Sequence, residues 1–299
     1  MNIMNLTEVV IRSEDTLDSL SRKVRLATIL GTLQSTLTYF PYLRKIWANN
    51  TEEERLLGVS LTGIMDNIEL VKGGISLEKL REIAVQTNKE WADLLGINPS
   101  TAITCVKPSG TVSQLVDSAS GIHPRHSAYY IRSVRADNKD PLTQFMKEAG
   151  IPNEPEVNKP EQTTVFYFPI KSPDKARVRD DLSAIEQLEF WKKVQEEWCE
   201  HKPSITVTVK EEEWPEVGGW VYKNFDIVSG VSFLPHSDHV YRQAPYQECS
   251  EATYKEMLMN MPKEIRWEDL SWYEKEDHTT GIQALACAAD GSCEIVDIT

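Results

Sequence analysis

The order of secondary-structure patterns is the feature that most constrains the fold of this chain. Segments with the apolar spacing of amphipathic helices, such as 76–96, alternate with short apolar or β-branched runs typical of buried strands, such as 58–64 and 204–209. Helices and strands that alternate in this way favour an α/β fold. Because the sequence contains no internal repeat and no clear linker, we expect one α/β body over residues 1–276 and a flexible tail over residues 277–299.

Residues that favour helix ends mark several of the boundaries. Ser76 and Gly96 stand at the two ends of one helical segment, as an N-cap and a terminating glycine. Asp140 is placed to cap a second helix, with proline at its first position. We also expect Ser13 to cap the first long helix, and Thr51 to open a short helix through the capping-box pattern TEEE.

The charge balance excludes several classes of function. With 32 basic and 46 acidic residues, the chain has a formal net charge of -14, which opposes binding to nucleic acids and to anionic membranes. The sequence has no apolar run long enough to span a membrane, and its first residues lack the basic and apolar blocks of a signal peptide. We therefore expect a cytoplasmic protein that binds neither nucleic acid nor membrane.

The cysteines are few and scattered, which is unlike the disulfide framework of a small secreted protein. Cys105 lies within an apolar pattern typical of a core, whereas Cys287 and Cys293 lie in a segment of small residues without apolar periodicity. A mobile pair of thiols that exchanges disulfides is one interpretation of the terminal pair. A metal clip is the other, although neither a CxxC pair nor a histidine stands beside these two cysteines.

A short loop between a strand pattern and a helix pattern is a candidate anion site. It consists of Lys107, Pro108, Ser109, Gly110 and Thr111. Hydroxyl groups and free backbone N–H groups at a helix N-terminus suit a phosphate. The alternative is an ordinary turn in which Ser109 or Thr111 caps the helix.

A cluster of basic side chains follows this loop in an otherwise acidic chain. It comprises His123, Arg125, His126, Arg132 and Arg135. Local positive charge indicates an anionic ligand nearby, for which His123 and Arg125 are the candidates together with Lys107. For Arg132 and Arg135, pairing with surface carboxylates is an equally good explanation. The histidines do not have zinc-ligand spacing with any cysteine, so we expect no metal site here.

Five stretches of the sequence resemble the adenosylcobalamin-dependent ribonucleoside-triphosphate reductases, the monomeric class II ribonucleotide reductases. They are NLTEVVIR, EEERLLGVSLTGIMD, TCVKPSGTVSQLVDSASGIHPRHSAYYIRSVRADNKDP, GVSFLPHSDHVYRQAPYQE and CAADGSCEI, in family order along nearly the whole chain. The resemblance implies the C-terminal portion of a ten-stranded α/β barrel. It also implies reduction of a ribose 2′-hydroxyl by a cysteine thiyl radical that adenosylcobalamin generates.

The resemblance also assigns roles to particular residues. Pro108, Ser109, Gly110 and Thr111 would belong to the loop that holds the phosphates of a ribonucleoside triphosphate. Cys287 and Cys293 would form a mobile redox arm that reduces the active site and is itself reduced by thioredoxin or a similar dithiol donor.

Three departures from the family pattern shape this interpretation. The Asn-Pro-Cys-Gly-Glu motif of the radical cysteine does not occur in the 299 residues, Met4 stands where the family usually has a redox cysteine, and the arm cysteines are one residue further apart. We therefore expect an oxidoreductase that is inactive alone and needs an N-terminal half of the reductase. The alternatives are a fragment of an ordinary reductase and a catalytically dead remnant that binds phosphate or carries the dithiol.

Overall fold

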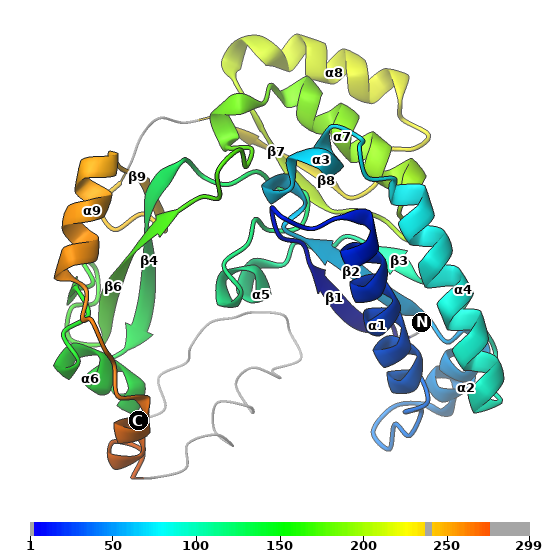
Figure 1. Ribbon diagram of the computed structural model, residues 1–299, viewed down its shortest axis with the longest axis horizontal. Coiled ribbons are helices and arrows are strands. Elements are labelled where there is room, and N and C mark those ends of the chain that lie inside the picture. The colour runs from blue at the N-terminus through cyan, green and yellow to red at the C-terminus, as the bar shows by residue number, and fades with distance from the viewer. Residues whose placement is uncertain (1–2, 237–240, 276–299) are drawn as a thin grey trace. The chain divides into compact units, whose positions relative to one another are not determined.

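The computed structural model describes residues 3–236 and 241–275, and its chain divides into two compact units (Figure 1). Unit 1 comprises Met1–Ala128 and Lys171–His239, and unit 2 comprises Tyr129–Ile170 and Val240–Thr299. The sequence patterns did not indicate this division. The predicted tail over residues 277–299, with Cys287 and Cys293, lies outside the described residues.

Parallel strands form the centre of unit 1. Strands β1 (Asn5–Val10), β2 (Leu57–Thr62) and β3 (Thr104–Cys105) form one parallel sheet, and β7 (Ile205–Val209) pairs in parallel with β8 (Val231–Pro235). A parallel bridge between Val106 and Pro203 continues β3 toward β7, and Ser204 N donates a hydrogen bond to Val106 O at 3.0 Å. The strands therefore follow one another in the order β1-β2-β3-β7-β8, all in one direction.

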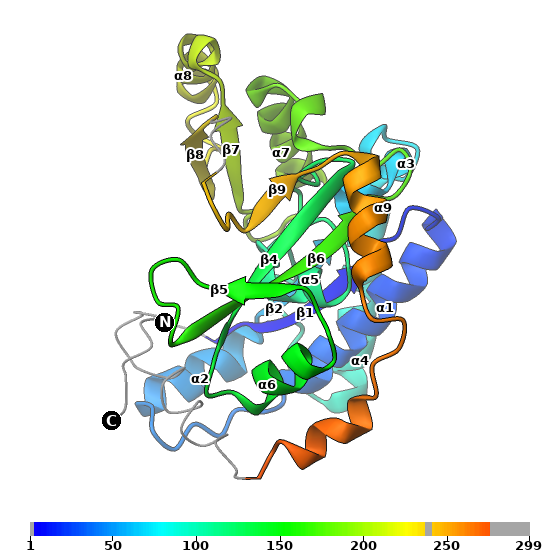
Figure 2. The same ribbon diagram turned by 90° about the vertical axis from the view of Figure 1, so that its left-hand side faces the viewer.

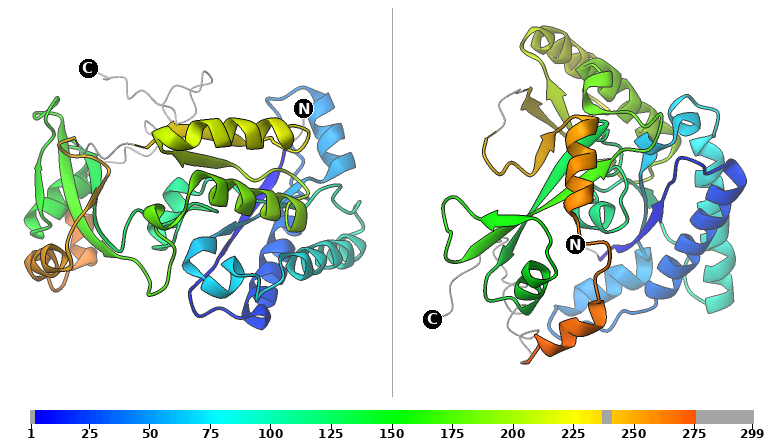
Figure 3. Two further views of the ribbon diagram at one scale, coloured as in Figure 1. Left: turned by 90° about the horizontal axis from the view of Figure 1, so that it is seen from above. Right: turned by 60° about the vertical axis from the view of Figure 1, so that its left-hand side comes forward.

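Helices cover one face of these strands. The long ones are α1 (Leu17–Gln34), α4 (Leu77–Leu95), α7 (Ala184–Glu197) and α8 (Trp214–Lys223). Figures 1 and 3 show α1 and α4 side by side along β1 and β2. Shorter elements join them: α2 (Lys45–Glu54), η1 (Ile64–Asp66), α3 (Ile68–Val71), α5 (Gly110–Leu115), η2 (Arg179–Asp181) and η3 (Glu211–Glu213).

The alternation of side chains along each strand separates the two faces of the sheet. Val9, Leu57 and Val59 point toward the helices and are fully or almost fully buried in the hydrophobic core with residues of α1, α4 and α7. Because neighbouring side chains on a strand point to opposite faces, Glu8 and Ser60 lie on the face without helices. We call this second surface the open face.

Unit 2 is built around an antiparallel sheet (Figure 2). Its strands follow the order β5-β6-β4-β9, with bounds β4 Tyr129–Asp137, β5 Asn153–Pro155, β6 Thr163–Lys171 and β9 Tyr246–Glu248. Helices α6 (Pro141–Glu148) and α9 (Glu251–Asn260) and the 3-10 helix η4 (Trp267–Trp272) complete it. Phe145 of α6 packs on Trp267 and Tyr273, with both ring-centroid distances at 5.5 Å.

Most of the predicted helix boundaries are confirmed, and two are wrong. Ser76 caps α4 and Gly96 ends it in the left-handed conformation, while Asp140 caps α6. The cap of α1 is Thr16 instead of Ser13, because Thr16 and Ser19 form a reciprocal capping box. Thr51 lies in the last turn of α2, so the pattern TEEE closes this helix instead of opening it.

Among the described residues, no helix is both long enough and apolar enough to cross a membrane.

Candidate anion site

Residues 107–110, the first four of the predicted anion loop 107–111, lie against the open face of the sheet in unit 1. Lys107 N donates a hydrogen bond to Ser60 Oγ on β2 at 3.0 Å, and Ser109 Oγ donates to Glu8 Oε2 on β1 at 2.6 Å. These two bonds hold the loop to two adjacent strands. Beside the loop lies a cavity of about 440 Å³, lined by Leu6, Thr7, Glu8, Ser60, Lys107, Pro108, Ser109, Gly110 and Val112.

The loop leads into α5, and its residues do not behave as an ordinary helix cap. Ser109 occupies the N-cap position, but its side chain makes no capping hydrogen bond, and its hydroxyl donates instead to Glu8. At Gly110, an added Cβ would meet no atom within 4 Å, so the space in front of this residue is open. The alternative that Ser109 merely caps the helix is therefore not supported. The side chain of Thr111 is outside what the structure describes.

Glu8 is an acidic residue beside a loop that we expect to bind an anion. Burial raises the pKa of its carboxyl group, while hydrogen bonds from Ser109 and Ser60 partly oppose this effect. Its second oxygen, Oε1, is buried and has no hydrogen-bond partner among the described residues. Glu8 and Ser60 were not among the predicted site residues; the signal available for them was their polar character within two strand patterns.

The structure gives Arg125 partners within the protein. Its guanidinium group donates to both carboxylate oxygens of Asp66, with Nε–Oδ1 and Nη2–Oδ2 distances of 2.9 Å. Nη1 also donates to Asp117 Oδ1 at 2.7 Å, and the side chain is 3% exposed. The prediction that Arg125 binds an anion is therefore not supported, since the buried carboxylate of Asp66 and the exposed carboxylate of Asp117 already pair with its charge.

His123 is likewise engaged with the backbone. Its Nδ1 lies 2.9 Å from Ser120 O, and its Nε2 accepts a hydrogen bond from Thr206 N at 3.0 Å. Nδ1 therefore carries the proton and donates it to the carbonyl oxygen. Burial lowers the pKa of His123, which favours this neutral form. The residue links the segment after α5 to strand β7 and is not available to an anion in this arrangement.

The remaining basic residues of the cluster also have partners. Arg132 lies over the ring of Tyr246, with 4.4 Å from its Cζ atom to the ring centroid, and donates to Pro245 O. Arg135 donates to Gln243 O and lies 4.0 Å from a carboxylate oxygen of Glu156. Both belong to unit 2, where they join β4 to the residues before β9. His126 is partly buried, and burial together with the charge of Arg179 lowers its pKa to about 4.

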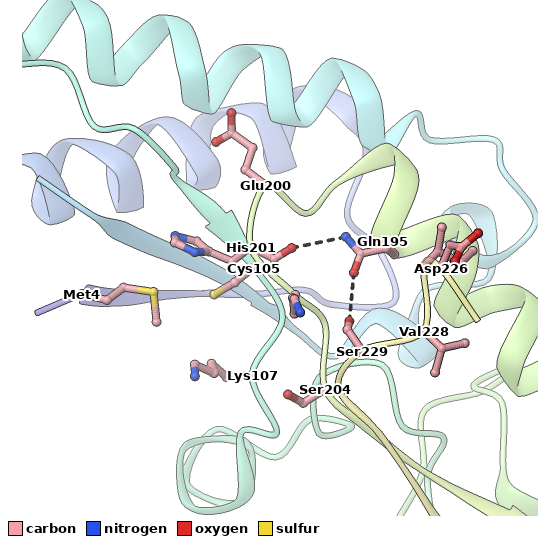
Figure 4. A pocket seen from close by; sticks show the side chains of 12 residues that line it. Met4, Cys105, Lys107, Gln195, Glu200, His201, Ser204, Asp226, Val228 and Ser229 are labelled. Carbon is pink, nitrogen blue, oxygen red and sulfur yellow. Dashed lines mark hydrogen bonds between the residues drawn. The ribbon is translucent and has the colours of Figure 1, made fainter. Parts of the chain in front are cut away.

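A second cavity of about 710 Å³ in unit 1 contains Met4 and Cys105 (Figure 4). An added Cβ on Gly58 would lie 3.2 Å from Met4 Sδ and 3.3 Å from Cys105 Sγ, so the absence of a side chain at Gly58 lets both sulfur atoms approach the sheet. Burial raises the pKa of Cys105 to about 12, which keeps it a protonated thiol near neutral pH. Lys107 lines this cavity as well as the cavity beside the anion loop.

The described residues contain no group of three or more His, Cys, Asp or Glu side chains that suits a metal ion.

Comparison with solved structures places this fold in a known class. The crystal structure of a B12-dependent, class II ribonucleotide reductase superposes with a TM-score of 0.78 over 92% of this chain and 42% of that one, at 23% identity. The fold is therefore that of the class II ribonucleotide reductases, as the sequence resemblance predicted.

Curated relatives narrow the resemblance to one kind of reductase, although no family model matches the sequence. The adenosylcobalamin-dependent ribonucleoside-triphosphate reductase of Euglena gracilis is 27% identical over 278 residues, which are 89% of this chain and 37% of that protein. The reductase of the same name from Levilactobacillus brevis is 31% identical over 179 residues, 58% of this chain and 24% of that protein. The predicted resemblance is confirmed, and the chain spans about a third of the length of the relatives that match it over most of its residues.

Proposed function

We propose that this chain is the C-terminal part of an adenosylcobalamin-dependent ribonucleoside-triphosphate reductase and acts together with an N-terminal half. Its contributions are the phosphate-binding residues Pro108, Ser109, Gly110 and Thr111 and the redox pair Cys287 and Cys293. The observation that carries the proposal is the position of loop 107–110 on the open face of a parallel sheet whose fold matches a class II reductase.

The open face supports the need for a second half. Leu6 of β1 is 49% exposed, Leu234 of β8 is 56% exposed, and Leu115 of α5 is 84% exposed. Leu6 and Leu234 lie on the side of the sheet opposite the helices, and exposed leucines on the outer strands of a sheet form a surface that another protein segment would cover. The relatives are about three times as long as the segment that this chain matches, so they contain enough sequence for such a segment.

In this proposal the chain binds the substrate and supplies reducing equivalents. The triphosphate would be held by the N–H groups of Ser109 and Gly110, the Ser109 hydroxyl and the ammonium group of Lys107, since amide and ammonium donors suit phosphate oxygens. Oxidation of the Cys287 and Cys293 thiols to a disulfide would provide the electron pair and protons that reduce the active site. A thioredoxin-type donor would then restore both thiols through disulfide exchange.

Adenosylcobalamin, the cofactor that appears in the relatives' names, would supply the radical chemistry. The described part of the open face provides hydrogen-bond donors for a phosphate and a buried thiol. We assign none of its residues to the cobalamin. The radical cysteine would come from an N-terminal half with the Asn-Pro-Cys-Gly-Glu motif.

The experiment that tests the proposal measures deoxyribonucleoside triphosphate formed from a ribonucleoside triphosphate. This chain is mixed with an N-terminal half that carries the Asn-Pro-Cys-Gly-Glu motif, adenosylcobalamin and a thioredoxin system. Turnover in the mixture and in neither half alone supports the proposal. Replacing Cys287 with Ser should stop turnover that depends on thioredoxin, because a single thiol cannot form the disulfide.

One observation favours a second candidate function, that of a non-catalytic remnant. Met4 stands where the family usually has a redox cysteine, and a thioether cannot form a disulfide. A mixture that forms a complex and binds nucleotide but gives no product would favour the remnant. Restored turnover with Met4→Cys would identify this residue as the cause.

A further inference from the structure

A row of side chains crosses the open face beneath the anion loop. Glu8 of β1 pairs in register with Ser60 of β2, and Ser60 pairs with Cys105 of β3. Ser60 and Glu8 each hold the loop by accepting one hydrogen bond. Ser60 Oγ accepts from Lys107 N, and Glu8 Oε2 accepts from Ser109 Oγ. The carboxyl group of Glu8 therefore lies directly under the residues that we propose bind phosphate.

This arrangement creates a conflict for an anionic ligand. Glu8 Oε2 accepts the Ser109 hydroxyl at 2.6 Å, so a carboxylate already uses a donor that a phosphate needs. Lys107 is the other charged residue that lines the cavity, and the groups facing Glu8 from β2 and β3 are the neutral hydroxyl of Ser60 and the thiol of Cys105. One ammonium group is too little positive charge to offset both a carboxylate and a triphosphate.

A proton on Glu8 removes the conflict. Oε1 is buried without a hydrogen-bond partner among the described residues, so no donor stabilises a negative charge on this oxygen, and the neutral acid is favoured. Burial already raises the pKa of Glu8, and an anion placed beside it would raise this pKa further, because like charge disfavours the ionised form.

We propose that loop 107–110 binds a phosphate-type anion together with a proton, and that Glu8 carries this proton. The proton comes from solvent and binds to the Glu8 carboxylate, so no group is oxidised or reduced. The neutral acid no longer repels the anion, and the Ser109 hydroxyl becomes free to turn to the same ligand. This inference rests on the proposed phosphate role of the loop and adds a proton dependence that the role alone does not require.

Sulfate is a suitable probe, because its charge does not change over the relevant pH range. Titration calorimetry of the 299-residue chain with sulfate, at about pH 7 in two buffers of different ionisation enthalpy, measures the protons taken up on binding. We expect uptake of up to about one proton per sulfate, and an affinity that falls by up to about tenfold per pH unit where Glu8 is ionised in the free chain.

Three variants separate the proton from the fold. Glu8→Gln keeps the size of the side chain and an oxygen acceptor for Ser109, so it should bind sulfate without proton uptake. Its advantage in affinity over the unchanged chain should grow by up to about tenfold per pH unit where Glu8 is ionised. Glu8→Asp retains a titratable carboxyl group and should retain the uptake. Glu14→Gln is the matched control, because Glu14 also accepts a serine hydroxyl, from Ser13 at 3.0 Å, but at an exposed position. It should behave as the unchanged chain.

Sulfate binding without proton uptake, or uptake that persists in Glu8→Gln, would overturn the inference, and so would the absence of sulfate binding. A failure of this inference can be distinguished from a failure of the proposed function. Turnover by the mixture of the two halves, with no proton uptake on sulfate binding, would refute the role of Glu8 alone and leave the proposed function intact. Loss of both turnover and sulfate binding would remove the phosphate role of the loop as well.

Discussion

Replacing Arg125 with Ala should strongly destabilise unit 1. The guanidinium group is 3% exposed and makes two hydrogen bonds to Asp66, one to the carboxylate of Asp117 and one to Asp117 O. Removing it leaves the carboxylate of Asp66 buried without its cation, although Ala119 N still donates to Asp66 Oδ2. Breaking one side of a buried ion pair costs about 3–5 kcal/mol, a large part of the roughly 5–15 kcal/mol that stabilises a typical domain.

Urea unfolding followed by circular dichroism measures this loss as a lower free energy of unfolding. The matched control is Arg25→Ala, because Arg25 pairs with Glu90 at 3.1 Å while both side chains are more than 40% exposed. An exposed pair contributes about 0–1 kcal/mol, so the control should unfold at nearly the same urea concentration as the unchanged chain. Equal effects of the two substitutions would refute the reasoning that burial makes the Arg125 pairs structurally important.

Three further predictions follow from local geometry and charge. The pKa of His126 is about 4, below the ordinary 6.5, so the unfolded chain takes up the proton first and the folded chain should lose stability as the pH falls from about 6.5 toward 4. Urea unfolding over this pH range should show the loss of stability, and His126→Gln should reduce it. An unchanged dependence of the unfolding free energy on pH in this variant would contradict the attribution of the loss to His126. Gly58→Val should destabilise the chain by about 1–3 kcal/mol, since an added Cβ would lie 2.4 Å from a leucine Cδ2 on β1, whereas Gly110→Ala should change stability by less than about 0.5 kcal/mol because nothing lies within 4 Å. Thermal unfolding of both glycine variants would test this, and equal destabilisation would be inconsistent with the packing described. Among the described cysteines, burial keeps Cys105 protonated and covered, so iodoacetamide at about pH 8 should modify the partly exposed Cys249 sooner, as mass spectrometry of the peptides would show; faster modification of Cys105 would oppose this account.

Local patterns were sufficient to predict the fold class and several elements. The apolar spacing and end residues of segment 76–96 predicted α4 with its cap at Ser76, because both signals act within one turn of the helix. The order of helices and strands predicted an α/β architecture, because each segment shows its own apolar spacing without reference to distant contacts. The cap of α1 was misplaced because the segment holds several residues able to cap, and only the reciprocal bonds of Thr16 and Ser19 select between them.

Contacts between distant parts of the sequence were not predictable in this way. Arg125 lies 59 residues from Asp66, so the sequence showed a free cation where the fold places a buried ion pair. The bond between Ser109 and Glu8 joins residues 101 positions apart, which concealed the acidic residue beneath the anion loop. Unit 2 depends on the pairing of β4 with β9, where Tyr130 lies opposite Glu248, and no local pattern indicates that return of the chain.

The most direct test of the central claim is the amount of deoxyribonucleoside triphosphate that the chain forms with a complementary N-terminal half, adenosylcobalamin and a thioredoxin system. The account predicts sustained product formation by the mixture, none by either half alone, and loss of the thioredoxin-dependent product in Cys287→Ser. A stable complex that binds substrate and cofactor yet forms no product, with Met4 unchanged or replaced by Cys, would contradict the proposal that this chain takes part in ribonucleotide reduction.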